Sequence, residues 1–245
     1  MKLWKKLRRR LAAPPVHVLE PRVAYDRWAR QYAEEKNPVL HLATQTLQKL
    51  LPELHGKSVL DAGCGAGHRM QQLAPQIMVG ADFSFNMLCA ARAASRAVKS
   101  LRLVNADLLA LPFHDESFDL VISAFVLGYL APLETAVSEL ARVTRAGGTL
   151  LLADFHPLGH WLGWNRSFLE CHNGKLEEFR IVNCRHQHED YFRAFKKNGL
   201  HVEDLCEPPL DDSVKHFFDR TRKGRKVYER FHGFPVVLIF KLTKR

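Results

Sequence analysis

The chain has 245 residues, an apolar fraction of 47% and a formal net charge of +10. This length and composition fit one α/β domain with a full hydrophobic core. The sequence contains no run of about 18 uninterrupted apolar residues, so no membrane-spanning helix is predicted. The five cysteines are widely spaced and form no CxxC pair, which predicts a reduced, cytoplasmic protein without a disulfide framework.

The positive charge lies at the two ends of the chain. Residues 1–13 carry six Lys or Arg and no acid, and residues 215–245 carry ten against two acids, which leaves residues 14–214 with a net charge of −4. A mildly acidic centre argues against nucleic acid as a partner, although the basic ends could still bind an anionic one.

The first 13 residues also carry an apolar pattern. Leu3, Leu7 and Leu11 repeat every four residues beside Trp4, with basic residues between them. Such a segment predicts weak peripheral contact with an anionic membrane, and the alternative is a solvated terminus.

Two helices are expected before the first strand of the core. The proline-rich residues 14–21 should be irregular. Helical patterns then follow in "VAYDRWARQYAEE" and "NPVLHLATQTLQKLLPEL". In the second of these, Asn37 can cap the helix and Pro38 suits its first position.

From residue 57 the pattern alternates between strand and helix. Buried parallel strands are expected at "SVLDAG", "IMVGAD", "LRLVNAD", "FDLVISAFV" and "GTLLLADF". Helices are expected directly after the first of these strands, at 84–98, at 132–145 and at 188–198. Strands are expected at 200–206 and at "PVVLIFKLT". This order predicts a Rossmann-like, doubly wound α/β sheet, mostly parallel, with an antiparallel last strand.

The expected organisation is a basic N-terminal segment, 1–20, and a single domain, 21–245. The parts of that domain are a helical cap (21–56), a cofactor-binding core (57–155), a small insertion with a helix after the fifth strand (156–199) and closing strands (200–245).

The glycine-rich stretch "LDAGCGAGH" departs from known phosphate-binding loops. Gly63 and Gly65 match the first two glycines of the dinucleotide fingerprint, but His68 stands at the third position. Asp61 would place a carboxylate near the two phosphates of a dinucleotide, whereas it suits a cationic ligand such as S-adenosylmethionine.

The sequence resembles the class I S-adenosylmethionine-dependent methyltransferases, in the small-molecule branch that includes malonyl-carrier-protein O-methyltransferases and quinone C-methyltransferases. The elements that carry the resemblance come in the family's order: "LDAGCGAG", "VGADFS", "NADLLALPF", "SFDLVISAFVLGYL" and "ELARVTRAGGTLLLADF". The upstream "YDRWARQY" resembles a helix that closes over the cofactor.

The resemblance implies a set of residues around S-adenosylmethionine. Asp61, Gly63 and Gly65 would line its methionine end, and Asp82 would accept hydrogen bonds from the ribose. Phe83 and Met87 would flank adenine, and Asp107 and Leu108 would bind its edge. Ala124, Phe125, Tyr25 and Tyr32 would complete the cavity.

Methyl transfer from a sulfonium needs positioning, exclusion of water and, for a protonated acceptor, a general base. We expect His156, His186 and Tyr191 to serve on the acceptor side, because histidine titrates near neutral pH and the resemblance places His186 and Tyr191 beside the substrate. The alternative is that these aromatic side chains only pack together. We expect no metal, because His156/His160 and His186/His188 have suitable spacing but no third ligand.

The predicted function is methyl transfer to a small molecule, for which an anionic or carrier-bound acceptor is compatible with the basic termini. Two alternatives stay open. One is an RNA or protein methyltransferase steered by these termini. The other is a non-catalytic cofactor-binding domain whose cavity is filled by Trp161 and Trp164. The oligomeric state is not predicted.

Overall fold

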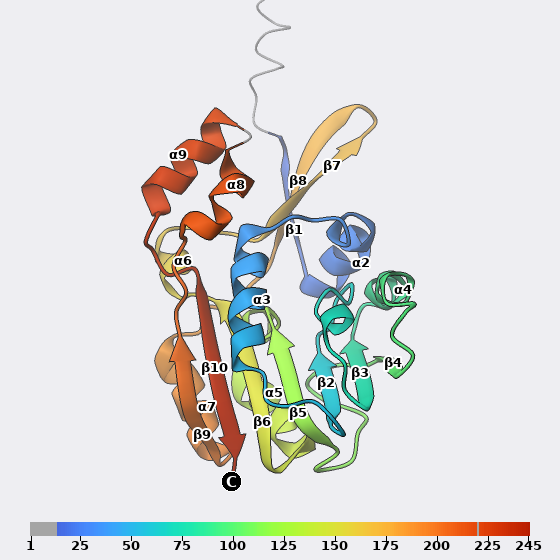
Figure 1. The fold of residues 1–245 in the computed structure, drawn as a ribbon. Helices are drawn as coiled ribbons and strands as arrows, with labels where there is room; N and C mark the ends of the chain where they lie inside the picture. The colour runs from blue at the N-terminus through green and yellow to red at the C-terminus, as the bar shows by residue number, and fades with distance from the viewer. Residues whose placement is uncertain (1–13, 220) are drawn as a thin grey trace, which may run out of the picture.

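The computed structural model describes residues 14–219 and 221–245. Its centre is a seven-stranded sheet with the order β4-β3-β2-β5-β6-β10-β9, in which only β10 runs antiparallel (Figure 1). The strands are β2 (Ser58–Ala62), β3 (Ile77–Asp82), β4 (Leu101–Asn105), β5 (Phe118–Ala124), β6 (Thr144–Phe155), β9 (Leu200–Cys206) and β10 (Val237–Lys244). The predicted Rossmann-like fold with an antiparallel last strand is confirmed.

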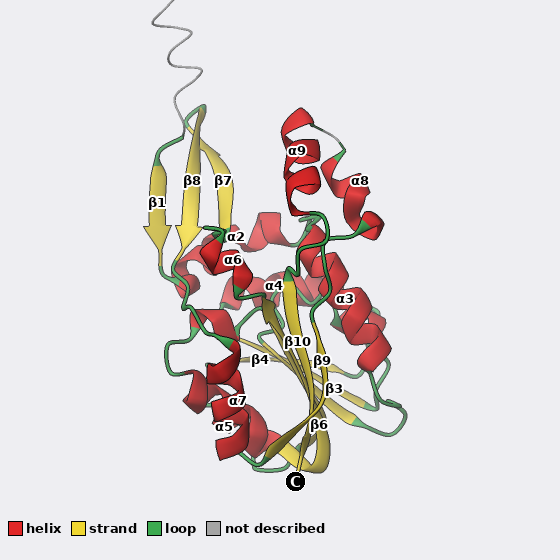
Figure 2. Cartoon of the chain, turned by 90° about the vertical axis from the view of Figure 1, so that its left-hand side faces the viewer, coloured by secondary structure: helices red, strands yellow, loops and turns green. Residues whose placement is uncertain are grey.

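Helices cover both faces of this sheet (Figure 2). On one face α5 (Leu133–Val143) and α7 (His188–Lys197) pack against each other and against the strands. On the other face lie α3 (Pro38–Leu50) and α4 (Phe85–Ala94). The central strands β2 and β5 are therefore almost wholly buried, which explains their near-continuous apolar sequences.

The predicted cap helices form, with α2 at Pro21–Tyr32 and α3 beginning after the expected cap. The Asn37 Oδ1 accepts hydrogen bonds from the Val39 and Leu40 amides at 2.9 and 3.3 Å, and Pro38 occupies the first helical position. Asn37 therefore satisfies two of the amides that a helix start leaves without partners.

The prediction of a helix directly after β2 is wrong. Only a single 3-10 turn, η1 (Met70–Gln72), forms between β2 and β3. Gly63, Gly65 and Gly67 all have positive φ angles of 78°, 53° and 80°, so the irregular turn extends far into this connection. Too few residues then remain before Pro75 for a helix to nucleate.

The prediction that residues 14–21 are irregular is also wrong in part, because Val16–Leu19 forms strand β1. β1 pairs in parallel with β8 (Lys175–Ile181), which pairs antiparallel with β7 (Ser167–His172). The expected insertion after β6 supplies this hairpin and the short helix α6 (Leu158–Trp161). A tertiary pairing partner that lies about 160 residues away thus decides the conformation of β1.

Residues 200–245 hold more than closing strands. Between β9 and β10 lie the turn η3 (Asp212–Val214), the short helix α8 (Lys215–Phe218) and α9 (Arg222–Phe231). These helices form a lobe at the end of the molecule where the parallel strands terminate (Figure 1). No helix among the described residues is long and apolar enough to cross a membrane.

Replacing Asn37 with Ala should lower the free energy of unfolding by about 1 kcal/mol, because two amides of α3 lose their acceptor. Chemical denaturation would measure the change. Asn37→Asp keeps a capping oxygen and is the control, so an equal loss in both variants would contradict the capping role.

Candidate functional site

A cavity of about 670 Å³ lies over the carboxyl ends of β2, β3 and β5. It is lined by eleven of the residues predicted to bind a cofactor: Tyr25, Tyr32, Gly63, Gly65, Asp82, Phe83, Met87, Asp107, Leu108, Ala124 and Phe125. Such crevices at the carboxyl edge of an open α/β sheet are the usual place for a ligand in this class of fold.

The glycine turn brings backbone close to this cavity. The Gly63 and Cys64 amides both donate to the Ala81 carbonyl, at 2.7 and 3.0 Å, which folds the turn over the end of β3. A Cβ atom at Gly63 would lie 2.1 Å from a methyl carbon of Val126. Glycine is therefore required at this position both by its positive φ and by the close approach of Val126, which follows β5.

Asp82 stands at the end of β3 beside this turn. Its two carboxylate oxygens accept hydrogen bonds from the Gly65 amide at 2.8 Å and from the Ser84 amide at 2.9 Å. Burial raises the pKa of Asp82 to about 6, although these two amides oppose the shift. The side chain thus offers fixed acceptor oxygens to the cavity above that pH.

Asp61 is the one predicted cofactor residue that does not line the cavity. Its carboxylate is fully buried and accepts a hydrogen bond from the Arg69 guanidinium at 2.8 Å. Arg69 lines the cavity in its place and also donates to the Gly63 carbonyl at 3.3 Å. Asp61 is therefore shielded from the cavity by a cation.

This buried pair leaves hydrogen-bonding capacity unused. The Asp61 Oδ2 and the Arg69 Nε are both buried and have no partner among the described residues. An unsatisfied buried polar atom is costly, so these two atoms lower the stability that the pair contributes. Only Arg69 of the pair lines the cavity and could contact a ligand there. The sequence analysis missed Arg69. A pattern that could have indicated it is a basic residue that follows, within a few positions, an acidic residue near the end of a buried strand.

Aromatic side chains from α2 close the cavity on another side. The Tyr25 hydroxyl donates to the Tyr129 hydroxyl at 2.9 Å, and burial raises the pKa of Tyr25, Tyr32 and Tyr129. The phenols therefore stay protonated. Arg166 stacks over Trp28 with 4.5 Å between the guanidinium carbon and the ring centroid.

A smaller cavity of about 240 Å³ adjoins the first and shares Asn37 and Tyr129 with it. The predicted acceptor-side residues His156, His186 and Tyr191 line this smaller cavity, and none of them lines the larger one. The structure thus brings the three residues together in the smaller cavity, and Tyr129 lies between them and the larger cavity.

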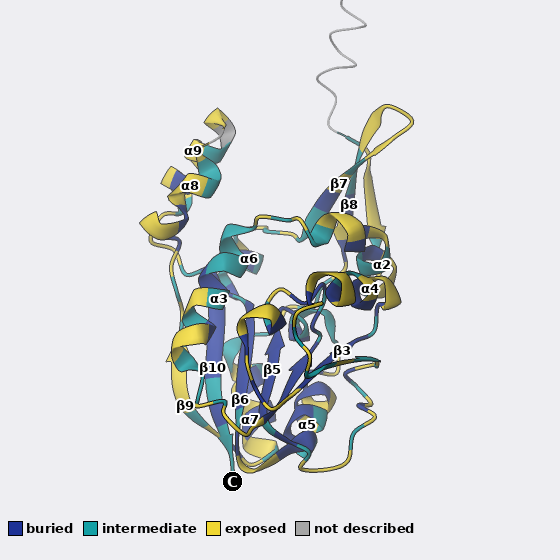
Figure 3. Ribbon diagram, turned by 45° about the vertical axis from the view of Figure 1, so that its right-hand side comes forward, coloured by how far each residue is buried: buried dark blue, intermediate teal, exposed yellow. Residues whose placement is uncertain are grey.

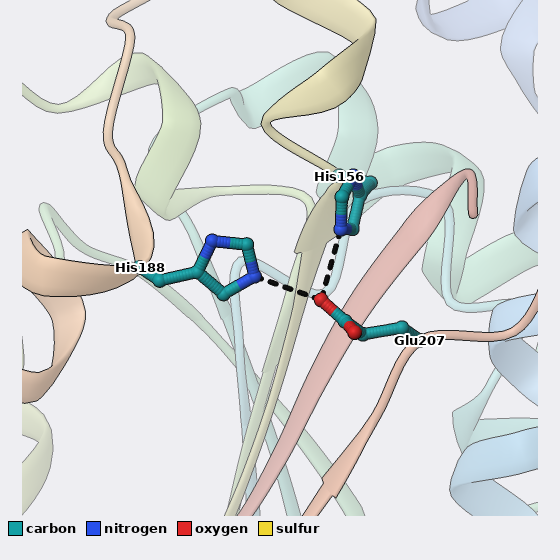
Figure 4. Close-up of side chains that lie close together, drawn as sticks. All are labelled: His156, His188 and Glu207. Carbon is teal, nitrogen blue, oxygen red and sulfur yellow. Dashed lines mark hydrogen bonds and ion pairs between the residues drawn. The ribbon is translucent and has the colours of Figure 1, made fainter. Parts of the chain in front are cut away.

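His156 has both ring nitrogens engaged. Its Nδ1 accepts a hydrogen bond from the Leu158 amide at 3.1 Å, so in the neutral ring Nε2 carries the proton. This Nε2 donates to Glu207 at 2.9 Å (Figure 4). His156 therefore has no free nitrogen with which to take a proton from an acceptor, and its contacts do not favour the predicted catalytic role.

His188 contacts the same Glu207 oxygen at 2.8 Å, so three potential metal-ligand atoms lie within 4.8 Å of one another (Figure 4). The structure thus supplies a third group that the sequence pattern did not show. A metal on the Nε2 of His156 would need the proton on Nδ1, where the Leu158 amide already points. The geometry favours a hydrogen-bonded cluster over a metal site.

His186 has the opposite arrangement. Its Nε2 lies 2.9 Å from the Leu130 carbonyl, which can only accept, so the neutral ring presents an unprotonated Nδ1. Tyr191 is buried, and its hydroxyl donates a hydrogen bond to the Asp154 carboxylate at 2.9 Å. His186 is thus the predicted acceptor-side residue that is best prepared to accept a proton.

A further wall of the larger cavity was missed by sequence reasoning. His41 of α3 and His216 and Phe217 of α8 line it, with ring centroids 5.4 Å apart for His41 and Phe217. No local motif relates two helices so distant in the chain, so only the tertiary structure could reveal this wall.

Comparisons with known proteins agree with this architecture. Residues 60–152 match the family described as a methyltransferase domain. The demethylmenaquinone methyltransferase of Thermobifida fusca is 36% identical over 118 residues, covering 44% of this chain and 50% of that protein. The malonyl-[acyl-carrier protein] O-methyltransferase of Halorhodospira halophila is 34% identical over 141 residues, covering 56% and 48%. The chain thus spans about half the length of these curated relatives.

Among solved structures, magnesium protoporphyrin IX methyltransferase from Synechocystis, with bound S-adenosylhomocysteine, matches with a TM-score of 0.60 at 20% identity. The match covers 91% of this chain and 94% of that one. This likeness supports the fold. Residues 60–152 of the chain are therefore similar to a methyltransferase domain, and its relatives include demethylmenaquinone and malonyl-carrier-protein methyltransferases.

Proposed function

We propose that this protein transfers a methyl group from S-adenosylmethionine to a small-molecule acceptor. The observation that carries the proposal is the wall formed by Asp82, the glycine turn and Arg69, which presents a fixed carboxylate and a guanidinium to one cavity. S-adenosylmethionine carries a ribose diol, a carboxylate and an ammonium group, and it has no phosphate.

The residues present fit these groups. Asp82 would accept from the ribose hydroxyls, and Arg69 would bind the carboxylate. The Gly63 carbonyl would accept from the ammonium. Asp107, whose Oδ1 already accepts from the Leu109 amide at 2.9 Å, would lie at the adenine edge. When bound, S-adenosylmethionine supplies a methyl group on a positively charged sulfur.

The other residues of the site position the acceptor and exclude water. The Tyr25–Tyr129 hydrogen bond and the stacked Arg166 hold the aromatic cap closed over the cavity. For an acceptor that loses a proton, we assign proton acceptance to the Nδ1 of His186, in the adjoining cavity.

The acceptor class rests on the relatives. The relatives are named for demethylmenaquinone and for malonyl-acyl-carrier protein, both substrates of those enzymes. Arg22 and Lys36 line the larger cavity, but Glu20 and Glu35 line it too, so the proposal of an anionic or carrier-bound acceptor rests on the relatives. We propose that the protein works in the cytoplasm.

The two alternative functions find less support. Trp161 is 81% exposed and fills no cavity, whereas Trp164 lines the smaller cavity. Neither tryptophan lines the larger cavity, where the cofactor would bind, so a cofactor cavity filled by both is not supported. The basic segment 1–13, on which steering of RNA or protein would partly depend, lies outside the described residues.

Replacing Asp82 with Ala should weaken S-adenosylhomocysteine binding by about 1.5–3 kcal/mol, or about 10- to 150-fold, because hydrogen bonds to a charged group are lost. In the wild type, affinity should also fall as the pH drops below about 6, where the carboxylate takes up a proton. Calorimetric titration would measure both effects. Unchanged affinity in a folded variant, or equal binding of NAD⁺ by the wild type, would contradict the cofactor assignment.

Replacing Arg69 with Lys should weaken S-adenosylhomocysteine binding about tenfold and leave 5′-methylthioadenosine binding unchanged. The second ligand lacks the carboxylate that the guanidinium fork would bind. Lys keeps a positive charge beside buried Asp61, and a melting curve checks the fold. Equal losses for both ligands would assign Arg69 to structure alone.

Replacing His186 with Ala should lower turnover about 100-fold with an acceptor found by screening, while cofactor affinity stays constant, because a general base is removed. The matched control is His188→Ala, two residues away, whose imidazole contacts Glu207. Similar turnover in both variants would return His186 to a packing role.

A further inference from the structure

The three-stranded sheet of β1, β8 and β7 has two different faces. Side chains alternate along each strand, so His17, Phe168 and Phe179 share the inner face, where Phe168 stacks on Trp28 of α2 with centroids 4.8 Å apart. The inner face thus packs against the aromatic side chains of α2 beside the candidate site, and this packing explains why apolar residues occupy that face.

The outer face has exposed aliphatic side chains that pack into no hydrophobic cluster of the described residues. Val16 and Val18 of β1 are 43% and 67% exposed, and Leu169 of β7 and Leu176 of β8 are 49% and 50% exposed. None of these four belongs to a hydrophobic cluster within the described part of the chain. Arg180 lies on the same face and pairs with Glu178 at 2.9 Å, so the central charges neutralise each other.

This sheet projects from the molecule at the end where the parallel strands terminate (Figures 1 and 2). Figure 3 shows the β7–β8 hairpin as largely exposed. The α8–α9 lobe projects at the same end, and the described side chains of α9 include four exposed cations, Arg222, Arg225, Lys226 and Arg230. An apolar sheet face and a basic helix therefore lie at the same end of the molecule.

The sequence before β1 is strongly basic. Residues 1–13 carry six Lys or Arg and no acid, and in the sequence only Pro14 and Pro15 separate them from Val16. The membrane contact predicted for this segment lies outside the described residues.

We propose that the outer face of the β1–β8–β7 sheet docks on an anionic lipid surface. Dispersed aliphatic side chains without a pocket suit the interface of a bilayer, and adjacent cations suit its negative surface potential. The larger cavity is lined by Glu20 and Pro21, directly after β1, and by His216 and Phe217 of α8, so both projections adjoin it. Docking would thus place the cavity near the lipid. The proposal does not depend on the methyl-transfer chemistry.

The test is sedimentation of the full chain with vesicles of equimolar phosphatidylglycerol and phosphatidylcholine, and with vesicles of phosphatidylcholine alone. We expect binding to the anionic vesicles that is at least about tenfold tighter and that weakens in high salt. The double variant Val18→Asp/Leu169→Asp should lose this binding at least about tenfold. The control is Leu205→Asp, which adds a charge at a similarly exposed aliphatic residue of β9.

Melting curves and S-adenosylhomocysteine titration confirm that each variant is folded. Equal binding by the double variant and the control would overturn the role of the sheet. Equal binding to both kinds of vesicle would overturn the electrostatic part. Absence of binding to either would overturn the lipid proposal and favour an acidic protein as the partner of this surface.

Discussion

A buried carboxylate at the end of β2 constrains the whole cofactor wall. Asp61 lies in the centre of the sheet with no exposed surface, so its charge must be balanced inside the protein. Arg69 supplies that balance and at the same time holds the Gly63 carbonyl, so one guanidinium ties the buried acid to the glycine turn. Breaking a buried pair of this kind typically costs about 3–5 kcal/mol.

The second half of the site is organised by hydrogen bonds that decide where protons lie. Three histidines stand close together, yet the Leu158 amide fixes the ring of His156, Glu207 engages His188, and the Leu130 carbonyl fixes His186. These partners, and not the spacing of histidines in the chain, separate a structural imidazole from one with a free acceptor nitrogen. Tyr129 and Asn37 line both the cavity of His186 and the larger cavity, so they stand between the two.

The parts added to the common sheet explain how one end of the molecule differs from the rest. β1 and the β7–β8 hairpin close the aromatic cap with one face and leave aliphatic residues outside on the other. The α8–α9 lobe contributes a wall of the larger cavity and a row of exposed cations. Both additions are inserted where strands end, so they change the surroundings of the site and leave the sheet intact.

The sequence by itself determined the alternating core, the Asn37 cap and most of the predicted residues that line the larger cavity, because these depend on local periodicity and on a glycine turn of fixed spacing. Only the tertiary structure decided the rest. It replaced the expected helix after β2 with η1, because three left-handed glycines use up the connection. It turned residues 16–19 into a strand, paired Arg69 with Asp61 and brought His41 to His216. Each of these depends on a partner that local sequence periodicity does not identify, and so none could be predicted from it.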